Sequence, residues 1–153
     1  MDIYNYLKKD HRKVADLMEQ VVAMESPSER QQLFQQIKVE LTLHADAEEK
    51  TFYQAVEKAT KAQLPRHEMK HAHGEHDEMR EYLQRLSATP AGDESWIELF
   101  GEFKHCVTHH VEEEEQDVFE QAKTYLKADQ AKQLAKDMDA LKMQAMAKSS
   151  EMA

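Results

Sequence analysis

The sequence of 153 residues has little of what turn-rich or disulfide-bonded proteins need. It contains three glycines, three prolines and a single cysteine, Cys106. The scarcity of glycine and proline favours long helices over strands joined by tight turns. A single cysteine excludes a disulfide within the chain and is typical of a reducing compartment. The N-terminal residues form no apolar leader, and no run of about 18 apolar residues occurs, so we expect a cytoplasmic protein that does not span a membrane.

Positive charge is also scarce. The chain has 20 lysines and arginines against 30 acidic residues, which gives a formal net charge of −10. No basic stripe is available to neutralise phosphates, so we expect neither nucleic acid nor an anionic membrane surface as a partner. Hydrophobic residues make up 41% of the chain, which is enough for the core of one domain.

The three prolines divide the chain into helical segments. Pro27 follows a capping serine, Pro65 predicts a helix boundary at the residue before it, and the loop at Pro90 leads to a candidate N-cap at Asp93 or Ser95. The predicted helices span residues 3–24, 27–60, 65–87, 94–126 and 128–148. Their connections are short, so consecutive helices should lie antiparallel.

These segments predict an all-α fold, an antiparallel up-down-up-down four-helix bundle with an additional C-terminal helix. We assign residues 1–126 to the bundle. Residues 127–153 form a C-terminal helical extension, which either packs on the bundle or acts as a tail. The extension has one apolar stripe, at residues spaced by three and four positions.

Six polar residues interrupt the apolar stripes of the four bundle helices, at positions where core residues are expected. Each helix has one inward histidine, and in two helices a glutamate follows it four residues later. The six residues are His11, His44, Glu48, His76, His110 and Glu114. Ionised carboxylates are almost never buried without a partner, and no lysine or arginine shares these stripes. A cation shared by the six side chains is therefore the simplest explanation.

The other histidines have simpler interpretations. His73 lies at the edge of its stripe and is the one further candidate ligand. Glu-x-x-His pairs of the kind that ferritin-like bundles use occur at Glu68–His71 and Glu102–His105. Both pairs lie off the apolar stripes, so we expect His71 and His105 to be exposed, and likewise His67 and His109, which fall on outer faces. Phe119 falls outside the stripe of its helix, and a straight helix does not explain it.

Four histidines and two glutamates exceed the needs of one tetrahedral zinc ion and suit two octahedral ions. Imidazole combined with carboxylate favours iron, manganese or zinc over calcium or magnesium. Two glutamates could span both ions, and a bridging oxide or hydroxide could offset the remaining positive charge.

Four motifs of the chain resemble those of the hemerythrin-like, or HHE cation-binding, family. They are DH at 10–11, HADAEEKTFY at 44–53, GEHDEM at 74–79 and HHVEEEEQDVF at 109–119. The resemblance implies a four-helix bundle around two non-heme iron ions in an Fe–O–Fe or Fe–OH–Fe centre, although other divalent metals are chemically compatible. It implies the same six residues as ligands, with Glu48 and Glu114 bridging.

The chain departs from the oxygen-carrying hemerythrins at two positions. Those proteins have a further histidine where this chain has Ala72, and an aspartate five residues after the last motif histidine, where this chain has Glu114 at four residues. We therefore expect a protein that binds or senses O₂, NO or peroxide, or that handles iron, rather than a stable oxygen carrier. Two alternatives remain open: a di-iron enzyme that acts on peroxide or NO or repairs iron centres, and a metal-free helical adaptor. No catalytic residue outside the metal ligands is indicated.

Overall fold

Capping residues fix where the first two helices begin. A computed structural model describes the backbone of residues 1–152 and the side chains of residues 1–148. The carboxylate of Asp2 accepts a hydrogen bond from the Asn5 amide (3.0 Å) at the start of α1, Ile3–Ala23. The hydroxyl of Ser26 accepts from the Glu29 amide (3.4 Å) at the start of α2, Pro27–Glu48. Each cap satisfies an amide that has no partner inside its helix.

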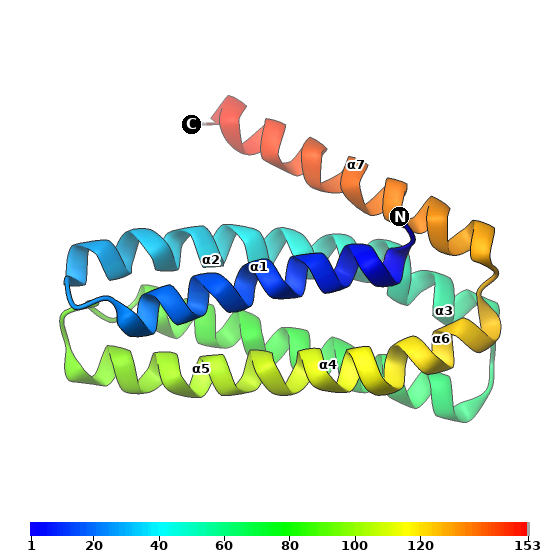
Figure 1. Ribbon diagram of the computed structural model, residues 1–153, viewed down its shortest axis with the longest axis horizontal. Helices are drawn as coiled ribbons and strands as arrows, with labels where there is room; N and C mark the ends of the chain where they lie inside the picture. Colours follow the sequence, from blue (N-terminus) through cyan, green and yellow to red (C-terminus); the bar gives the residue numbers. More distant parts are fainter. Residues whose placement is uncertain (153) are drawn as a thin grey trace.

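The helices run up-down-up-down, as the sequence predicts (Figure 1). After α1 and α2, the chain continues without a break through a π-helical turn η1, Glu49–Tyr53, into α3, Gln54–Ala59. The third bundle helix is α4, Gln63–Ser87. The fourth consists of α5, Glu94–Glu113, the π-helical turn η2, Glu114–Val118, and α6, Phe119–Tyr125. The described residues contain no strand, so the all-α prediction is confirmed.

The third helix begins earlier than Pro65 predicts. α4 starts at Gln63, and both Leu64 and Pro65 are helical, so the expected boundary at Leu64 is wrong. The amides of the first helical turn have no acceptor within the helix, and a proline there removes no hydrogen bond. Asp93 occupies the N-cap position of α5, although its side chain makes no capping hydrogen bond.

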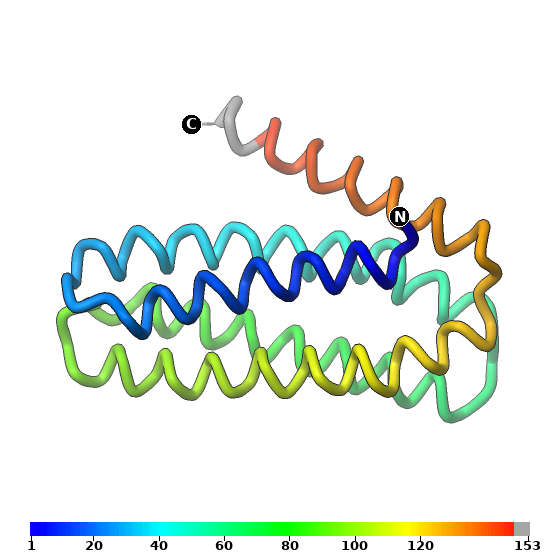
Figure 2. Tube along the Cα trace, viewed as in Figure 1, coloured from blue at the N-terminus to red at the C-terminus, as the bar shows by residue number. Residues whose placement is uncertain are grey.

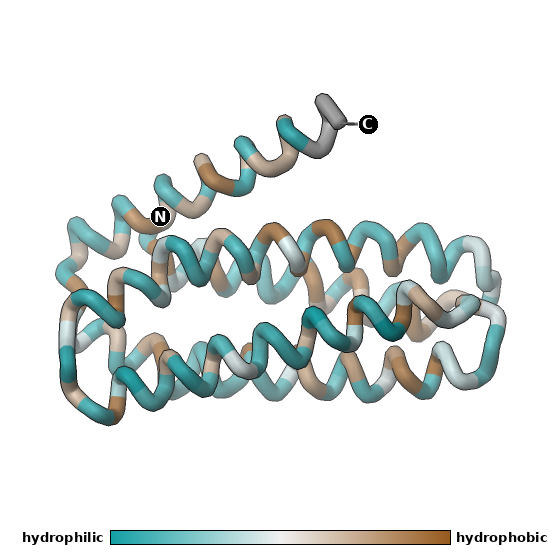
Figure 3. Tube along the Cα trace, turned by 180° about the vertical axis from the view of Figure 1, so that it is seen from behind, coloured by the Kyte–Doolittle hydropathy of each residue, from teal (hydrophilic) through white to brown (hydrophobic). Residues whose placement is uncertain are grey.

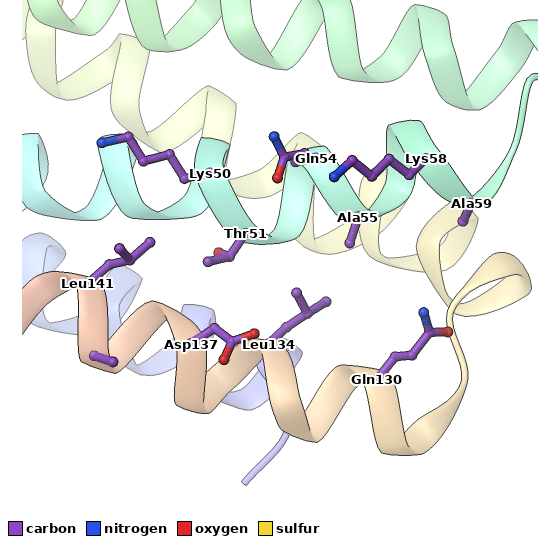
Figure 4. A pocket seen from close by; sticks show the side chains of 11 residues that line it. Lys50, Thr51, Gln54, Ala55, Lys58, Ala59, Gln130, Leu134, Asp137 and Leu141 are labelled. Atoms are coloured by element: carbon purple, nitrogen blue, oxygen red, sulfur yellow. The ribbon is translucent and has the colours of Figure 1, made fainter.

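The C-terminal helix α7, Ala128–Met152, crosses the bundle at an angle (Figure 2). It contacts α1, α2 and η1 through buried side chains, among them Ala131 and Met138. Leu134 and Leu141 project from α7 toward η1 and α3, beside a surface cavity of about 630 Å³ (Figure 4). Residue 153 of the predicted extension lies outside the described residues, and the domain division at residue 126 stays a prediction.

Hydrophobic residues recur at intervals along each helix rather than in one continuous run (Figure 3). Over the part of the chain that the structure describes, no helix has a stretch both long and apolar enough to cross a membrane. The buried hydrophobic residues form two separate clusters. One contains Phe52 and Phe119 and lies toward α3, α6 and α7, while the other contains Phe34 and Trp96 and fills the opposite half of the bundle.

The two π-helical turns explain Phe119. A π-turn closes i→i+5 hydrogen bonds and accommodates one extra residue, which rotates the chain beyond it by about 100° relative to a continuous α-helix. Phe119 follows η2 directly and is only 2% exposed, packed edge-on against Tyr4 and Phe52. η1 has the same effect in the second helix, where Tyr53 becomes fully buried.

Candidate metal centre

The six predicted side chains converge at the middle of the bundle, between the two hydrophobic clusters. All six are at most 7% exposed. They form two groups, each with potential ligand atoms within 4.8 Å of one another. The first group holds His11 and His44, the second holds His76 and His110, and both glutamates belong to both groups. This arrangement fits two metal ions bridged by the two carboxylates.

The four histidines point the same nitrogen toward the glutamates. His11 Nε2 lies 3.3 Å from Glu114 Oε1, and His110 Nε2 lies 3.2 Å from Glu114 Oε2. The Nε2 atoms of His44 and His76 lie 3.4 Å and 3.1 Å from Glu48 Oε1. Two ligand atoms that are each about 2.1 Å from one metal lie roughly 3.0–3.4 Å apart at octahedral or tetrahedral angles. The observed separations are those of ligands that share an ion.

In each of these four histidines, the other ring nitrogen, Nδ1, lies 2.9 Å from a carboxylate oxygen. Asp10 holds Nδ1 of His44, and Glu49 holds Nδ1 of His76. A carboxylate that accepts a hydrogen bond from Nδ1 favours the tautomer in which the Nε2 lone pair is free. Histidines that bind metals in proteins are commonly supported by such a carboxylate.

The same contact occurs on the remaining two histidines. Glu75 holds Nδ1 of His110, and Glu115 holds Nδ1 of His11. In all four cases, the carboxylate belongs to a different helix from its histidine. The first helix supports the second, the second supports the third, the third supports the fourth, and the fourth supports the first. The contacts therefore close into a ring around the bundle.

Buried atoms that make no hydrogen bond point to an ion at the centre. Among the described residues, five such atoms belong to the cluster: Nε2 of His11 and of His44, both carboxylate oxygens of Glu48, and Oε1 of Glu114. A buried polar atom left unsatisfied destabilises a fold by about 1–3 kcal/mol. A donor set of imidazoles and carboxylates with free lone pairs therefore fits two first-row metal ions.

Opposite charges shift the pKa values of the cluster in the metal-free protein. Burial lowers the pKa of His44, but the carboxylates of Glu48 and Asp10 outweigh burial and raise this pKa to about 9. Burial also lowers the pKa of His110, but contacts with Glu114 and Glu75 outweigh burial and raise this pKa to about 10. In the absence of metal, protons on His44 and His110 balance the glutamates, and metal ions would replace those protons.

Tyr53 belongs to the site although the sequence patterns do not indicate it. Its hydroxyl donates to Glu114 Oε2 at 2.6 Å and lies 3.3 Å from His76 Nε2 and 3.5 Å from His110 Nε2. Burial raises its pKa well above the usual value, as do the charges of Glu114 and Glu48, so the phenol keeps its proton. The matching position after Glu114 is Phe119, which has no hydroxyl.

The remaining histidines lie outside the centre. His73 bridges Glu49 and Glu57 with its two nitrogens, at 3.2 Å and 2.9 Å, and belongs to neither buried group. As predicted, four histidines are exposed: His67, His71, His105 and His109.

Comparison with known proteins identifies the family. The sequence profile described as "Hemerythrin HHE cation binding domain" matches residues 2–122. The chain belongs to the hemerythrin HHE cation-binding domain family. In fold, it is similar to a crystal structure of a hemerythrin HHE cation-binding domain-containing protein from Mycobacterium kansasii, with a TM-score of 0.81 and 26% sequence identity over 94% of this chain and 86% of that one.

A curated relative is much longer than this chain. A protein named DNA nickase from Nostoc sp. is 27% identical over 142 residues, which is 93% of this chain and 39% of the relative. The chain thus spans well under half of that protein. The hemerythrin HHE domain of this chain contains a buried His/Glu cluster that fits two metal ions.

Proposed function

We propose that the protein binds two non-heme iron ions at this centre and uses them to bind or sense O₂, NO or peroxide, or to handle iron. The observation that carries the proposal is the set of five unpartnered buried atoms directed at the centre. One ion would be held by His11 and His44, the other by His76 and His110, and Glu48 and Glu114 would contact both. Bound iron would supply redox chemistry and open coordination positions for a small ligand.

The protein's own groups would prepare the site for this chemistry. The four outer carboxylates fix the orientation of the imidazoles, so little rearrangement is needed when metal binds. The hydrophobic clusters on both sides keep bulk water from the centre. Tyr53 holds a proton at one half of the site, within hydrogen-bond distance of Glu114.

Metal content and an absorption spectrum test the proposal. Protein purified anaerobically from iron-supplemented cells should hold about two iron ions per chain, as the two His/Glu groups imply. Exposure to air should produce ferric absorption near the ultraviolet edge that changes on addition of azide or peroxide. An iron content well under one per chain would overturn the proposal. Glu114→Gln should lower the iron content, because Glu114 belongs to both groups of potential ligands. Glu112→Gln, which changes an exposed glutamate on α5, is the matched control and should leave the iron content unchanged.

A second candidate function is an enzyme that consumes peroxide or NO. Tyr53 favours it, because a buried phenol that keeps its proton can donate a hydrogen bond at one half of the centre. Catalytic consumption of added peroxide, reduced by Tyr53→Phe at unchanged iron content, would favour the enzyme over a sensor. We do not extend DNA nicking to this chain, because it covers 39% of the nickase and has a net charge of −10.

A further inference from the structure

The outer carboxylates of the ring differ in what lies on their solvent side. Glu49 pairs with Arg80, and Asp10 pairs with Lys142. The carboxylate of Glu75 pairs with no lysine or arginine among the residues whose side chains are described. Its Oε1 accepts from His110, and its Oε2 lies 3.5 Å from Nε2 of the exposed His71.

A second carboxylate approaches the same imidazole. Glu113 Oε2 lies 3.0 Å from His71 Nε2, and the other oxygen of Glu113 lies 3.0 Å from Nε2 of His109. Glu75, Glu113 and His71 each offer one ligand atom, and these three atoms lie within 4.8 Å of one another. Among the described residues, no lysine or arginine pairs with either glutamate, so two neighbouring negative charges share only imidazoles.

We propose that His71, Glu75 and Glu113 form a third, peripheral site for a divalent first-row metal ion. The His71–carboxylate separations of 3.0 Å and 3.5 Å match two ligands that each lie about 2.1 Å from one ion. Imidazole with two carboxylates selects ions such as zinc, cobalt or ferrous iron over magnesium and calcium.

The location suits capture of an ion from solution. His71, Gly74 and Glu75 line a surface cavity of about 400 Å³, and a Cβ at Gly74 would meet nothing within 4 Å. His71 is 51% exposed, whereas the carboxylate of Glu75 is nearly buried. Glu75 therefore connects the peripheral site to His110 of the central cluster, so an ion outside would act on the carboxylate that orients an inner imidazole.

Metal titration of the full chain tests this site separately from the central one. The central sites are first filled with two equivalents of iron, and Co²⁺ is then added while the visible cobalt absorption and the bound metal per chain are recorded. The wild type should bind one further ion. His71→Ala and Glu113→Gln should each weaken that step by at least about tenfold, while the iron content stays the same.

The control is His105→Ala, which removes an exposed histidine from α5 outside the cluster. It should bind cobalt like the wild type. Equal cobalt binding by the wild type and His71→Ala would overturn the proposal, as would an equal loss in His105→Ala. The titration is repeated on chelator-treated protein. If the chain takes up no iron but still binds one cobalt ion in a His71-dependent manner, the proposed function is contradicted and the peripheral site is supported.

Discussion

Replacement of Glu48 by leucine should destabilise the protein both with and without metal, and more strongly with metal. The five unpartnered atoms of the centre would each destabilise the metal-free fold by about 1–3 kcal/mol. Their sum, about 5–15 kcal/mol, is comparable with the whole stability of a typical domain. Ion pairs between protonated imidazoles and the two glutamates relieve part of this penalty, so we take about 5 kcal/mol as the expected loss on metal removal. For a chain of this size, that loss lowers the melting temperature by about 10–20 °C.

Glu48→Leu removes the carboxylate that lies 3.4 Å and 3.1 Å from Nε2 of His44 and His76 and that raises the pKa of His44. Removal of one partner from a buried ion pair is destabilising, because the other charge stays buried without compensation. The chelator-treated variant should therefore be less stable than the chelator-treated wild type by about 3–5 kcal/mol. In iron, the difference should be larger still, because the variant also lacks a ligand shared by both metal groups.

Thermal unfolding followed by circular dichroism measures the wild type and the variant, each with chelator and after iron reloading. Glu112→Leu is the control, since Glu112 is exposed and its replacement should change stability by no more than about 0.5 kcal/mol in either state. A shift of only a degree or two in the wild-type melting temperature on chelation would refute this prediction, as would equal stabilisation of Glu48→Leu and the wild type by iron.

Three further predictions concern groups around the centre. The raised pKa values of His44 (about 9) and His110 (about 10), against 6.5 in the unfolded chain, contribute stability that is complete below pH 6.5 and is lost as pH rises through the folded values. The melting temperature of chelator-treated protein should therefore fall from neutral to alkaline pH, while iron should stabilise more as pH rises; a flat alkaline profile would contradict this. Tyr53→Phe should destabilise the metal-free protein by about 1.5–3 kcal/mol in urea unfolding, because Glu114 loses its hydroxyl donor. The control is Tyr82→Phe, which should have little effect because the Tyr82 hydroxyl makes no hydrogen bond among the described residues. Asp10→Asn should weaken metal binding about 10–100-fold in competition with a chelator, because His44 loses a charged support, and equal affinity of this variant and the exposed-site control Asp16→Asn would argue against a supporting role.

Helical periodicity predicted the fold and the inward positions because both depend on spacing within single helices. His44 and Glu48 lie one turn apart on one face, and so do His110 and Glu114, so the 3.6-residue repeat places them without knowledge of the neighbours. The burial of all six residues confirms these positions. Their role as metal ligands stays a prediction.

Features that depend on other helices or on irregular turns could not be predicted in this way. Tyr53 and Phe119 reach the interior because a π-turn precedes or includes each of them, and a wheel drawn for a continuous α-helix turns them away. One sequence signal pointed to these two residues: in each helix, the aromatic residue lies five positions after the glutamate of a His-x-x-x-Glu motif. The outer carboxylates act across helices, so the periodicity of one helix carries no information about them, although each is a chain neighbour of a predicted ligand.

The ring of outer carboxylates has a consequence for chimeric proteins. Each bundle helix both receives a carboxylate from the helix before it and gives one to the helix after it. Exchange of one helix for that of a distant homologue therefore places two of the four junctions between unmatched partners. Exchange of two consecutive helices also creates only two mismatched junctions, because the contact between them travels with the graft. Grafting helices in adjacent pairs should thus preserve the centre better than grafting the same number of helices from opposite corners.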